Sequence, residues 1–245
     1  MPADSHADLT VGVLGLHSSK ETKAILNAIE ALGYDAEWLR RENIAVSITD
    51  GELTVEPDID VIANRLLLST STHPADEIGL ARLFENLYPM LNRPAPVTTA
   101  MHKFATAAAL ADADIPVPNA LLALSSERLN TGRERFGEQG VYKTAIGTHG
   151  GGAWVVDLAE PVNPRVGDRQ AFLQQFIERD GRPRDTRVYI VDGKHIGSMY
   201  RYAPDGEWRT NVSFGGKVED ATDDLPAAAV ETARRAADVI GLDYA

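Results

Sequence analysis

The chain has 245 residues, 44% of them hydrophobic, which is enough for two or three globular lobes. Its 36 acidic residues against 24 basic ones give a net charge of −12, which argues against nucleic acid or an anionic membrane as a partner. The absence of cysteine excludes disulfides and thiolate sites, so any metal would need oxygen or imidazole ligands. No apolar run approaches the ~18 residues that span a bilayer, and the first residues do not resemble a signal peptide, which predicts a cytoplasmic protein.

The basic residues are unevenly chosen, since only 6 of the 24 are lysine. An acid-rich, lysine-poor and cysteine-free composition suits a cytosol of high salt, where surface charge is screened and carboxylates hold hydration. It predicts a halophilic source. The alternative is an ordinary acidic cytosolic protein, which can have the same composition.

Residues 1 to about 97 alternate strand and helix patterns, which predicts a small α/β domain with a parallel sheet. Ser18 and Glu21 have capping-box spacing before a helix that ends at Gly33. Asp50-Gly51 is a favoured two-residue hairpin turn. The expected strands are 9–16, 34–39, 45–48, 52–55, 58–64 and 95–98, and the expected second helix is 75–88.

The rest of the chain predicts three helices and two hairpins. An alanine-rich helix carrying Lys103 is ended by a segment with two prolines. The Asp192-Gly193 turn predicts a strong hairpin. The expected helices are 101–113, 126–136 and a last one from 226 to 240; the expected strands are 120–124, 141–146, 153–156, 186–191 and 195–202; 169–177 is expected to be a short helix or a helix followed by a strand.

The stretch 140–158 joins two β-rich runs through a glycine-dense turn that holds Gly147, Gly150, Gly151 and Gly152. Glycine lets the backbone approach a ligand closely, so bare N–H groups could face a polyphosphate, and Lys143 in the first run would add a point charge. A P-loop is excluded because no Gly-Lys-Ser/Thr follows, and the dinucleotide fingerprint GxGxxG is absent from the first strand. The alternative is a flexible hairpin tip with a solvated lysine.

Basic residues also gather on the second hairpin and its continuation, although the chain is strongly acidic. They are Arg187, Arg201, Arg209 and Lys217. Taken singly, each arginine fits a surface salt bridge. Together, beside a glycine loop, they favour a site for a polyanion.

These motifs follow an order similar to that of the ATP-grasp superfamily, and their spacing most resembles its RimK-type glutamate ligases. The resemblance runs from about residue 60 to the end of the chain. The matching set is Lys103 before Pro116-Val117-Pro118, Val141-Tyr142-Lys143 before the glycine loop, Leu173-Gln174-Gln175-Phe176-Ile177, Asp185-x-Arg187, Arg201 and Arg209-Thr210-Asn211.

The resemblance implies a fold that is α/β and α+β: a Rossmann-like pre-ATP-grasp domain (1–97), a central lobe with a glycine-rich lid (98–178) and a C-terminal lobe (179–245), with ATP between the last two. It implies a role for each motif. Phosphates would contact Lys103 and Lys143 under the loop of Gly147, Gly150, Gly151 and Gly152; adenine would lie against Gln174, Gln175, Phe176 and Ile177; Arg187, Arg201, Arg209 and Asn211 would face the transferred phosphate and the acid substrate.

The activity implied is ATP-dependent joining of a carboxylate to an amine through an acyl phosphate, with release of ADP and phosphate. The implied partners are a small-molecule or peptide carboxylate and an amino acid, commonly glutamate, and relatives of this kind often form homodimers or homotetramers. Two other functions stay open: a catalytically inactive nucleotide-binding module of the same fold, and a nicotinamide-dependent oxidoreductase built on residues 1–97.

The sequence departs from the family pattern in three places. Basic residues often follow the Arg-x-Asn motif in the ribosomal-protein-modifying members, whereas this chain has Val212-Ser213-Phe214, so a ribosomal-protein acceptor is not expected. The family usually has Gln-Glu where this chain has Gln174-Gln175. The family also continues beyond the position of Ala245 with strands whose carboxylates hold Mg²⁺, so the expected fold is C-terminally incomplete and the metal ligands are expected beyond residue 245. The expectation is therefore either a piece of a longer ligase or a chain that cannot hold metal in the usual way.

Overall fold

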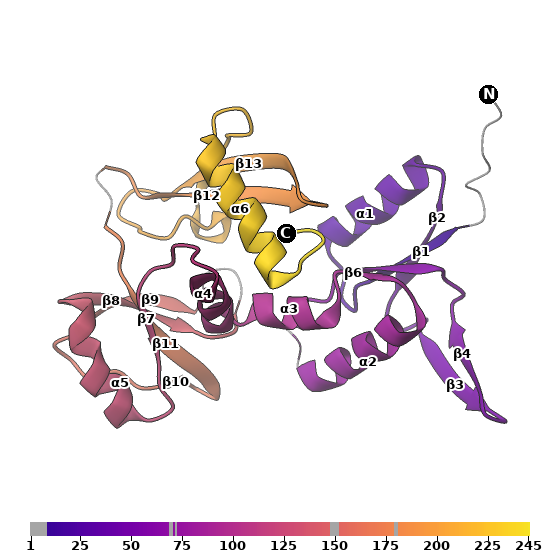
Figure 1. Cartoon of the computed structure of the whole chain (residues 1–245), viewed down its shortest axis with the longest axis horizontal. Helices are drawn as coiled ribbons and strands as arrows, with labels where there is room; N and C mark the ends of the chain where they lie inside the picture. The colour runs from indigo at the N-terminus through magenta and orange to yellow at the C-terminus, as the bar shows by residue number, and fades with distance from the viewer. Residues whose placement is uncertain (1–8, 69–70, 72, 148–151, 179–180) are drawn as a thin grey trace. The chain divides into compact units, whose positions relative to one another are not determined.

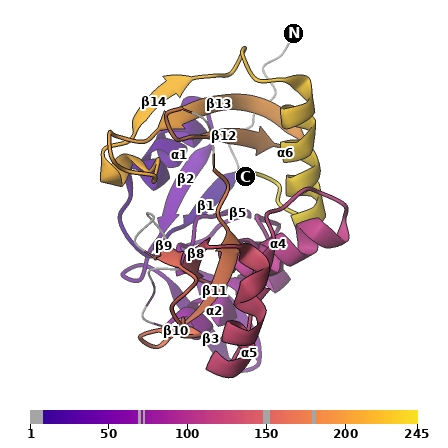
Figure 2. The same cartoon turned by 90° about the vertical axis from the view of Figure 1, so that its left-hand side faces the viewer.

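The computed structural model describes residues 9–68, 71, 73–147, 152–178 and 181–245. The chain divides into two compact units, Met1–Pro94 and Ala95–Ala245 (Figures 1 and 2). The predicted loop residues Gly150 and Gly151 lie outside the described residues. None of the helices in the described ranges is long and apolar enough to cross a membrane.

The first unit is built on a parallel sheet with the strand order β2-β1-β5-β6, as the alternating pattern predicts. Its core contains the fully buried side chains of Val13, Leu14, Leu39 and Ile62. Ser19 caps the first helix by accepting a hydrogen bond from the backbone N–H of Thr22, one residue after the predicted capping box begins. The elements of this sheet layer are β1 (Thr10–Leu14), α1 (Lys20–Ala31), β2 (Asp35–Leu39), β5 (Val61–Asn64), α2 (Pro74–Leu87) and β6 (Met90–Leu91).

A separate two-stranded sheet, β3 (Ala45–Thr49) and β4 (Glu52–Glu56), confirms the first predicted hairpin. Its turn residues Asp50 and Gly51 have φ angles of 54° and 86°. Positive φ at both central positions is the geometry that Asp-Gly favours in two-residue hairpins.

Two sequence-based assignments are wrong. Residues 95–98, expected as a strand, lie in the helix α3 (Pro94–Met101). Proline at the start of a helix has a suitable φ and lacks only an N–H that would have no partner there, so it favours helix over the local β-branched residues. Residues 169–175 form a strand, β11 (Arg169–Gln175), without a helical part, because Phe172 and Leu173 are buried between neighbouring strands on both sides.

The second unit begins with a mostly antiparallel sheet in the order β10-β11-β8-β9, in which β7 also pairs with β11. Its core centres on Leu129, Leu158 and Leu173. The strands β8 and β9 confirm the predicted hairpin around the glycine loop. The elements are α4 (Lys103–Asp112), β7 (Ala120–Leu122), α5 (Ser126–Gly132), the 3₁₀ helix η2 (Arg133–Phe136), β8 (Gln139–Thr144), β9 (Ala153–Asp157), β10 (Arg165–Val166) and β11.

The remaining part of this unit is a three-stranded antiparallel sheet, β12 (Arg184–Val191), β13 (Lys194–Tyr202) and β14 (Lys217–Asp220), with α6 (Ala227–Ile240) packed against it (Figure 2). Asp192 and Gly193 form the predicted turn, with φ angles of 49° and 67°. The short 3₁₀ helix η3 (Val212–Phe214) leads into β14. Residues 208–211, between β13 and β14, line one cavity together with residues of β8, β9 and β11.

Candidate functional site

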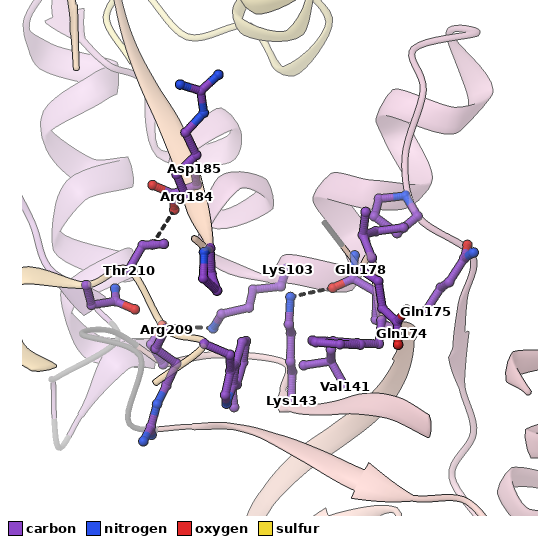
Figure 3. A pocket seen from close by; sticks show the side chains of 18 residues that line it. Lys103, Val141, Lys143, Gln174, Gln175, Glu178, Arg184, Asp185, Arg209 and Thr210 are labelled. Carbon is purple, nitrogen blue, oxygen red and sulfur yellow. Dashed lines mark hydrogen bonds between the residues drawn. The ribbon is translucent and has the colours of Figure 1, made fainter. Parts of the chain in front are cut away.

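A cavity of about 660 Å³ lies within the second unit and is lined by residues of both its sheets and of α4 (Figure 3). Of the predicted site residues, the cavity brings together Lys103, Lys143, Gly147, Gln174, Gln175, Phe176, Ile177, Arg209 and Asn211. Arg187, Arg201 and Gly152 are not among the lining residues.

Lys103 is the first residue of α4, and the preceding His102 caps the helix by accepting a hydrogen bond from the N–H of Ala105 at 3.1 Å. The Lys103 ammonium donates to the backbone carbonyls of Gly147 at 2.8 Å and Thr144 at 3.3 Å. These contacts tie the start of the helix to the glycine loop. The ammonium is therefore held at the mouth of that loop.

Lys143 enters the same cavity from β8, and its ammonium donates to the side-chain oxygen of Gln174 (Figure 3). Burial lowers the pKa of both lysines, and for Lys103 the charges of Lys143 and Arg169 lower it further. In the described part of the chain neither ammonium forms an ion pair with a carboxylate. Two cations that are close together and uncompensated favour an anionic ligand between them.

The end of the cavity beyond Lys143 is largely apolar. It is formed where β11 ends, at Phe176 and Ile177, together with Pro118 and Val141. Trp208 also lines this end of the cavity, and its ring meets that of Phe176 edge-on with centroids 6.3 Å apart. Apolar walls with a few fixed polar groups are typical of sites for a flat organic ring.

The two described glycines of the loop are packed against Thr144. A Cβ on Gly147 would lie 2.9 Å from the Thr144 hydroxyl oxygen, and a Cβ on Gly152 would lie 2.3 Å from it. Both distances are too short for a real side chain. Glycine at these two positions therefore lets the loop close onto the end of β8, which is a packing requirement in addition to any ligand contact.

Arg201 is held away from the cavity lining by Asp185, which is itself a lining residue. The Arg201 Nε donates to Asp185 Oδ1 at 2.8 Å, and the Thr210 hydroxyl donates to Asp185 Oδ2 at 2.8 Å. Burial alone would raise the pKa of Asp185, but the hydrogen bonds from Arg201 and Thr210 and the charges of Arg201 and Arg187 outweigh it and lower the pKa. The Asp185 carboxylate thus links the β12–β13 hairpin to the segment that carries Thr210.

Arg209 lines the cavity with its guanidinium stacked on Phe214, 3.8 Å from the ring centroid. It donates to Glu207 Oε2 at 2.7 Å, and this side-chain hydrogen bond is the main reason that the pKa of Glu207 falls to about 2. The Arg209 Nε is buried and has no hydrogen-bond partner among the described residues. A buried donor with no partner is costly, so this group has unused capacity for a bound oxygen.

The residues present therefore fit the phosphates and the base of a nucleotide. The described residues do not provide a protein-only metal site: across the described ranges, no group of three or more His, Asp or Glu side chains is placed to hold a metal ion.

The model of the RimK-like ATP-grasp domain matches residues 100–245, which is more than half of the chain. This chain belongs to the RimK-like ATP-grasp family. The match includes every residue that lines the cavity.

Relatives of the RimK-like family with curated names are similar over most of this chain. The tetrahydromethanopterin:alpha-L-glutamate ligase of Methanosarcina acetivorans is 29% identical over 174 residues, 64% of this chain and 52% of the relative. The N-acetylaspartylglutamate synthase A of Mus musculus is 26% identical over 234 residues, 87% of this chain and 58% of the relative. The chain thus spans a little over half the length of these relatives.

Among solved structures, the ATP-grasp ligase PsnB in complex with a minimal precursor, Mg and ADP superposes with a TM-score of 0.69 at 16% sequence identity, covering 100% of this chain and 84% of that chain. At this identity the likeness shows the fold alone. The expected fold class, ATP-grasp with both α/β and α+β parts, is confirmed.

Several lining residues of the RimK-like cavity were not predicted from the sequence. Five of them belong to the quoted motifs or directly follow one, namely Pro118, Val141, Glu178, Asp185 and Thr210, so the motifs were a usable signal. The other four belong to none of the quoted motifs and reach the cavity through the fold. They are Ala153, Pro183, Arg184 and Trp208.

Proposed function

We propose that this protein is an ATP-dependent carboxylate–amine ligase that adds glutamate to an acceptor through an acyl phosphate, releasing ADP and phosphate. The observation that carries the proposal is the convergence of Lys103 and Lys143, from α4 and β8, in one cavity without a carboxylate partner in the described residues. Membership of the RimK-like ATP-grasp family supports the reaction class.

The cavity is suited to hold ATP in one orientation. Its volume of about 660 Å³ is within the usual range for sites of small organic ligands, roughly 300–1,000 Å³. The base would lie at the apolar end, beside Phe176 and Trp208, and Glu178 would accept hydrogen bonds from ribose hydroxyls. The phosphates would then extend past Lys143 toward Lys103 and the glycine loop.

The acid substrate would lie next to the phosphates on the β12–β13 hairpin. Asp185 and Arg187 are two residues apart on β12, and Arg201 pairs with Asp185 across the sheet, so all three share one face. Asp185 lines the cavity. Arg187 and Arg201 would therefore border the place where an acceptor carboxylate meets the terminal phosphate, with Arg209 and Asn211 on its other side.

The reaction has two displacements. An acceptor carboxylate oxygen attacks the γ-phosphorus, the bond between that phosphorus and the β–γ bridging oxygen breaks, and ADP leaves. The amine of glutamate then attacks the acyl carbon, phosphate departs and the amine loses a proton. Lys103, Lys143 and Arg209 offset the repulsion between carboxylate and phosphate, and no nucleophilic side chain is needed. Bound Mg²⁺ would add further charge neutralisation of the same kind.

The proposal names glutamate but leaves the acceptor open. Both curated relatives described above carry glutamate in their names, whereas tetrahydromethanopterin appears in only one. A small molecule and a peptide are both compatible with the exposed hairpin face that carries Arg187. We also propose a cytoplasmic, high-salt setting and a homodimer or homotetramer, to be checked by unfolding at increasing KCl and by sedimentation.

Calorimetric titration of the protein with ATP and ADP, with and without Mg²⁺, followed by assay of ADP release on addition of glutamate and a panel of carboxylate acceptors, tests the proposal. We expect nucleotide binding, no binding of NADH, and ADP release that depends on glutamate. If ATP binds and ADP is never released, the protein is an inactive nucleotide-binding module. If neither nucleotide binds, the assignment of the cavity is wrong.

A further inference from the structure

Arg169 is a cation beside the glycine loop that belongs to none of the sequence motifs. It is the first residue of β11 and follows the two-residue turn of the β10–β11 hairpin, in which Val166 pairs with Arg169. Gly167 in that turn has a φ of 60°. The hairpin therefore presents Arg169 at the end of β11 opposite to the apolar wall of the cavity.

The Arg169 guanidinium lies close to the same loop atoms as Lys103. If Gly147 carried a Cβ, that atom would be 3.9 Å from Arg169 Nη1 and 3.8 Å from Lys103 Nζ. The Lys103 ammonium also donates to the Gly147 carbonyl at 2.8 Å. Two cations from different elements thus converge on one glycine, with Lys143 on the adjoining strand.

None of the described acidic residues forms an ion pair with Lys103, Lys143 or Arg169. Within 9–68, 71, 73–147, 152–178 and 181–245, Arg169 forms no ion pair with a carboxylate, although the chain has 36 acidic residues. The charge of Arg169 also contributes to the lowered pKa of Lys103. Three neighbouring cations that form no ion pair with a described carboxylate favour an anion as their ligand. The alternative is an arginine that is merely solvated at a hairpin end.

The position of Arg169 on β11 indicates which part of a bound nucleotide it would contact. Gln174 and Gln175, beside the apolar wall, are five and six residues after Arg169. At roughly 3.3 Å per residue, the two ends of the strand are about 17–20 Å apart. Lys143 pairs with Phe172 between them. Along the cleft, the apolar wall therefore comes first, Lys143 comes next, and Lys103 and Arg169 lie at the far end.

We infer that Arg169 is a third phosphate-binding residue, which together with Lys103 holds the end of the polyphosphate farthest from the base. This inference rests on the proposed nucleotide binding. A guanidinium can offer two parallel N–H donors to phosphate oxygens, whereas an ammonium acts as a point charge, so the arginine would orient the terminal phosphate as well as attract it.

The test is calorimetric titration of ATP, ADP and AMP into the wild-type chain and three variants at one salt concentration. Arg169→Gln removes the charge, and Arg169→Lys keeps it without the planar fork. Arg165→Gln is the matched control, because it removes the same charge from an exposed position of the same hairpin, and Arg165 neither lines the cavity nor is among the nearest neighbours of Gly147. The melting temperature of each variant without nucleotide serves as the folding check.

We expect Arg169→Gln to weaken ATP binding about tenfold, as for the loss of one charge-assisted hydrogen bond, with a smaller loss for ADP and none for AMP. Arg169→Lys should be intermediate, Arg165→Gln should match wild type, and the melting temperature of Arg169→Gln should not fall. The inference is overturned if wild type binds ATP and Arg169→Gln binds it equally well, or if AMP binding falls as much as ATP binding. If wild type binds no nucleotide, the proposed function fails first.

Discussion

Replacing Lys143 by methionine should change nucleotide affinity and unliganded stability in different ways. Its ammonium is largely buried, bonded to a neutral amide and unpaired with any described carboxylate. A hydrogen bond to a charged group contributes about 1.5–3 kcal/mol, so Lys143→Met should weaken ATP binding roughly 10- to 150-fold. Without ligand, relief from the buried charge offsets the lost bond to Gln174, so the free energy of unfolding at pH 7 should change by no more than about 1 kcal/mol.

The pH dependence gives a second check on the same residue. Burial lowers the pKa of Lys143 below 10.5, so on raising the pH the folded protein releases this proton before the unfolded chain does. The wild-type free energy of unfolding should therefore rise, relative to that of Lys143→Met, as pH increases from the lowered pKa toward 10.5. Each unit of lowering corresponds to about 1.4 kcal/mol.

Both effects can be measured by calorimetric titration of ATP and by urea unfolding followed through tryptophan fluorescence between pH 7 and 10. Lys194→Met is a suitable control, because the Lys194 side chain is 78% exposed at the start of β13, and its ammonium lies 3.4 Å from the Asp192 carboxylate. It should bind ATP like wild type. Wild-type ATP affinity in Lys143→Met, or a stability difference that does not grow with pH, would refute the reasoning.

Two further substitutions test how the cavity is supported. A Cβ at Gly216 would lie 2.1 Å from the Thr210 carbonyl oxygen, so Gly216→Ala should lower the free energy of unfolding by about 1–3 kcal/mol and weaken ATP binding. Gly197→Ala is the control: its Cβ would lie 3.6 Å from the Thr222 hydroxyl oxygen, an ordinary contact, so both stability and ATP binding should stay close to wild type. Asp185→Asn should lower the free energy of unfolding by about 1 kcal/mol near pH 7, a modest value because the Asp185 side chain is 43% exposed. The wild type should lose this stabilisation as the pH falls below 3.8 through the lowered pKa of Asp185, whereas the variant should not. The same acid dependence of stability in both proteins would contradict the role given to the bond between Asp185 and Arg201.

The sequence was a reliable guide wherever neighbouring residues decide the conformation. The Asp50-Gly51 and Asp192-Gly193 turns and the start of the first helix depend on neighbouring residues, and the structure confirms them. The parallel sheet was expected from the alternation of strand and helix patterns, and it too is confirmed. The helix at 94–101 did not follow from the local pattern, because its β-branched residues indicate a strand while Pro94 favours a helix start.

The site was predictable only as far as its motifs reach. Lys103 and Lys143 are 40 residues apart, and their ordered motifs were enough to expect them in one cavity, where the structure places both. The ion pair of Asp185 with Arg201 depends on cross-strand register, which the sequence does not specify directly. Trp208 and Arg169 belong to none of the quoted motifs, and packing between segments distant in the sequence brings Trp208 to the cavity and Arg169 close to Gly147.

Every lining residue of the cavity lies between Lys103 and Asn211, inside the second compact unit. Substitutions in the first 94 residues would therefore change none of the described side chains that line this cavity. Such an arrangement allows the two units of the chain to evolve at different rates.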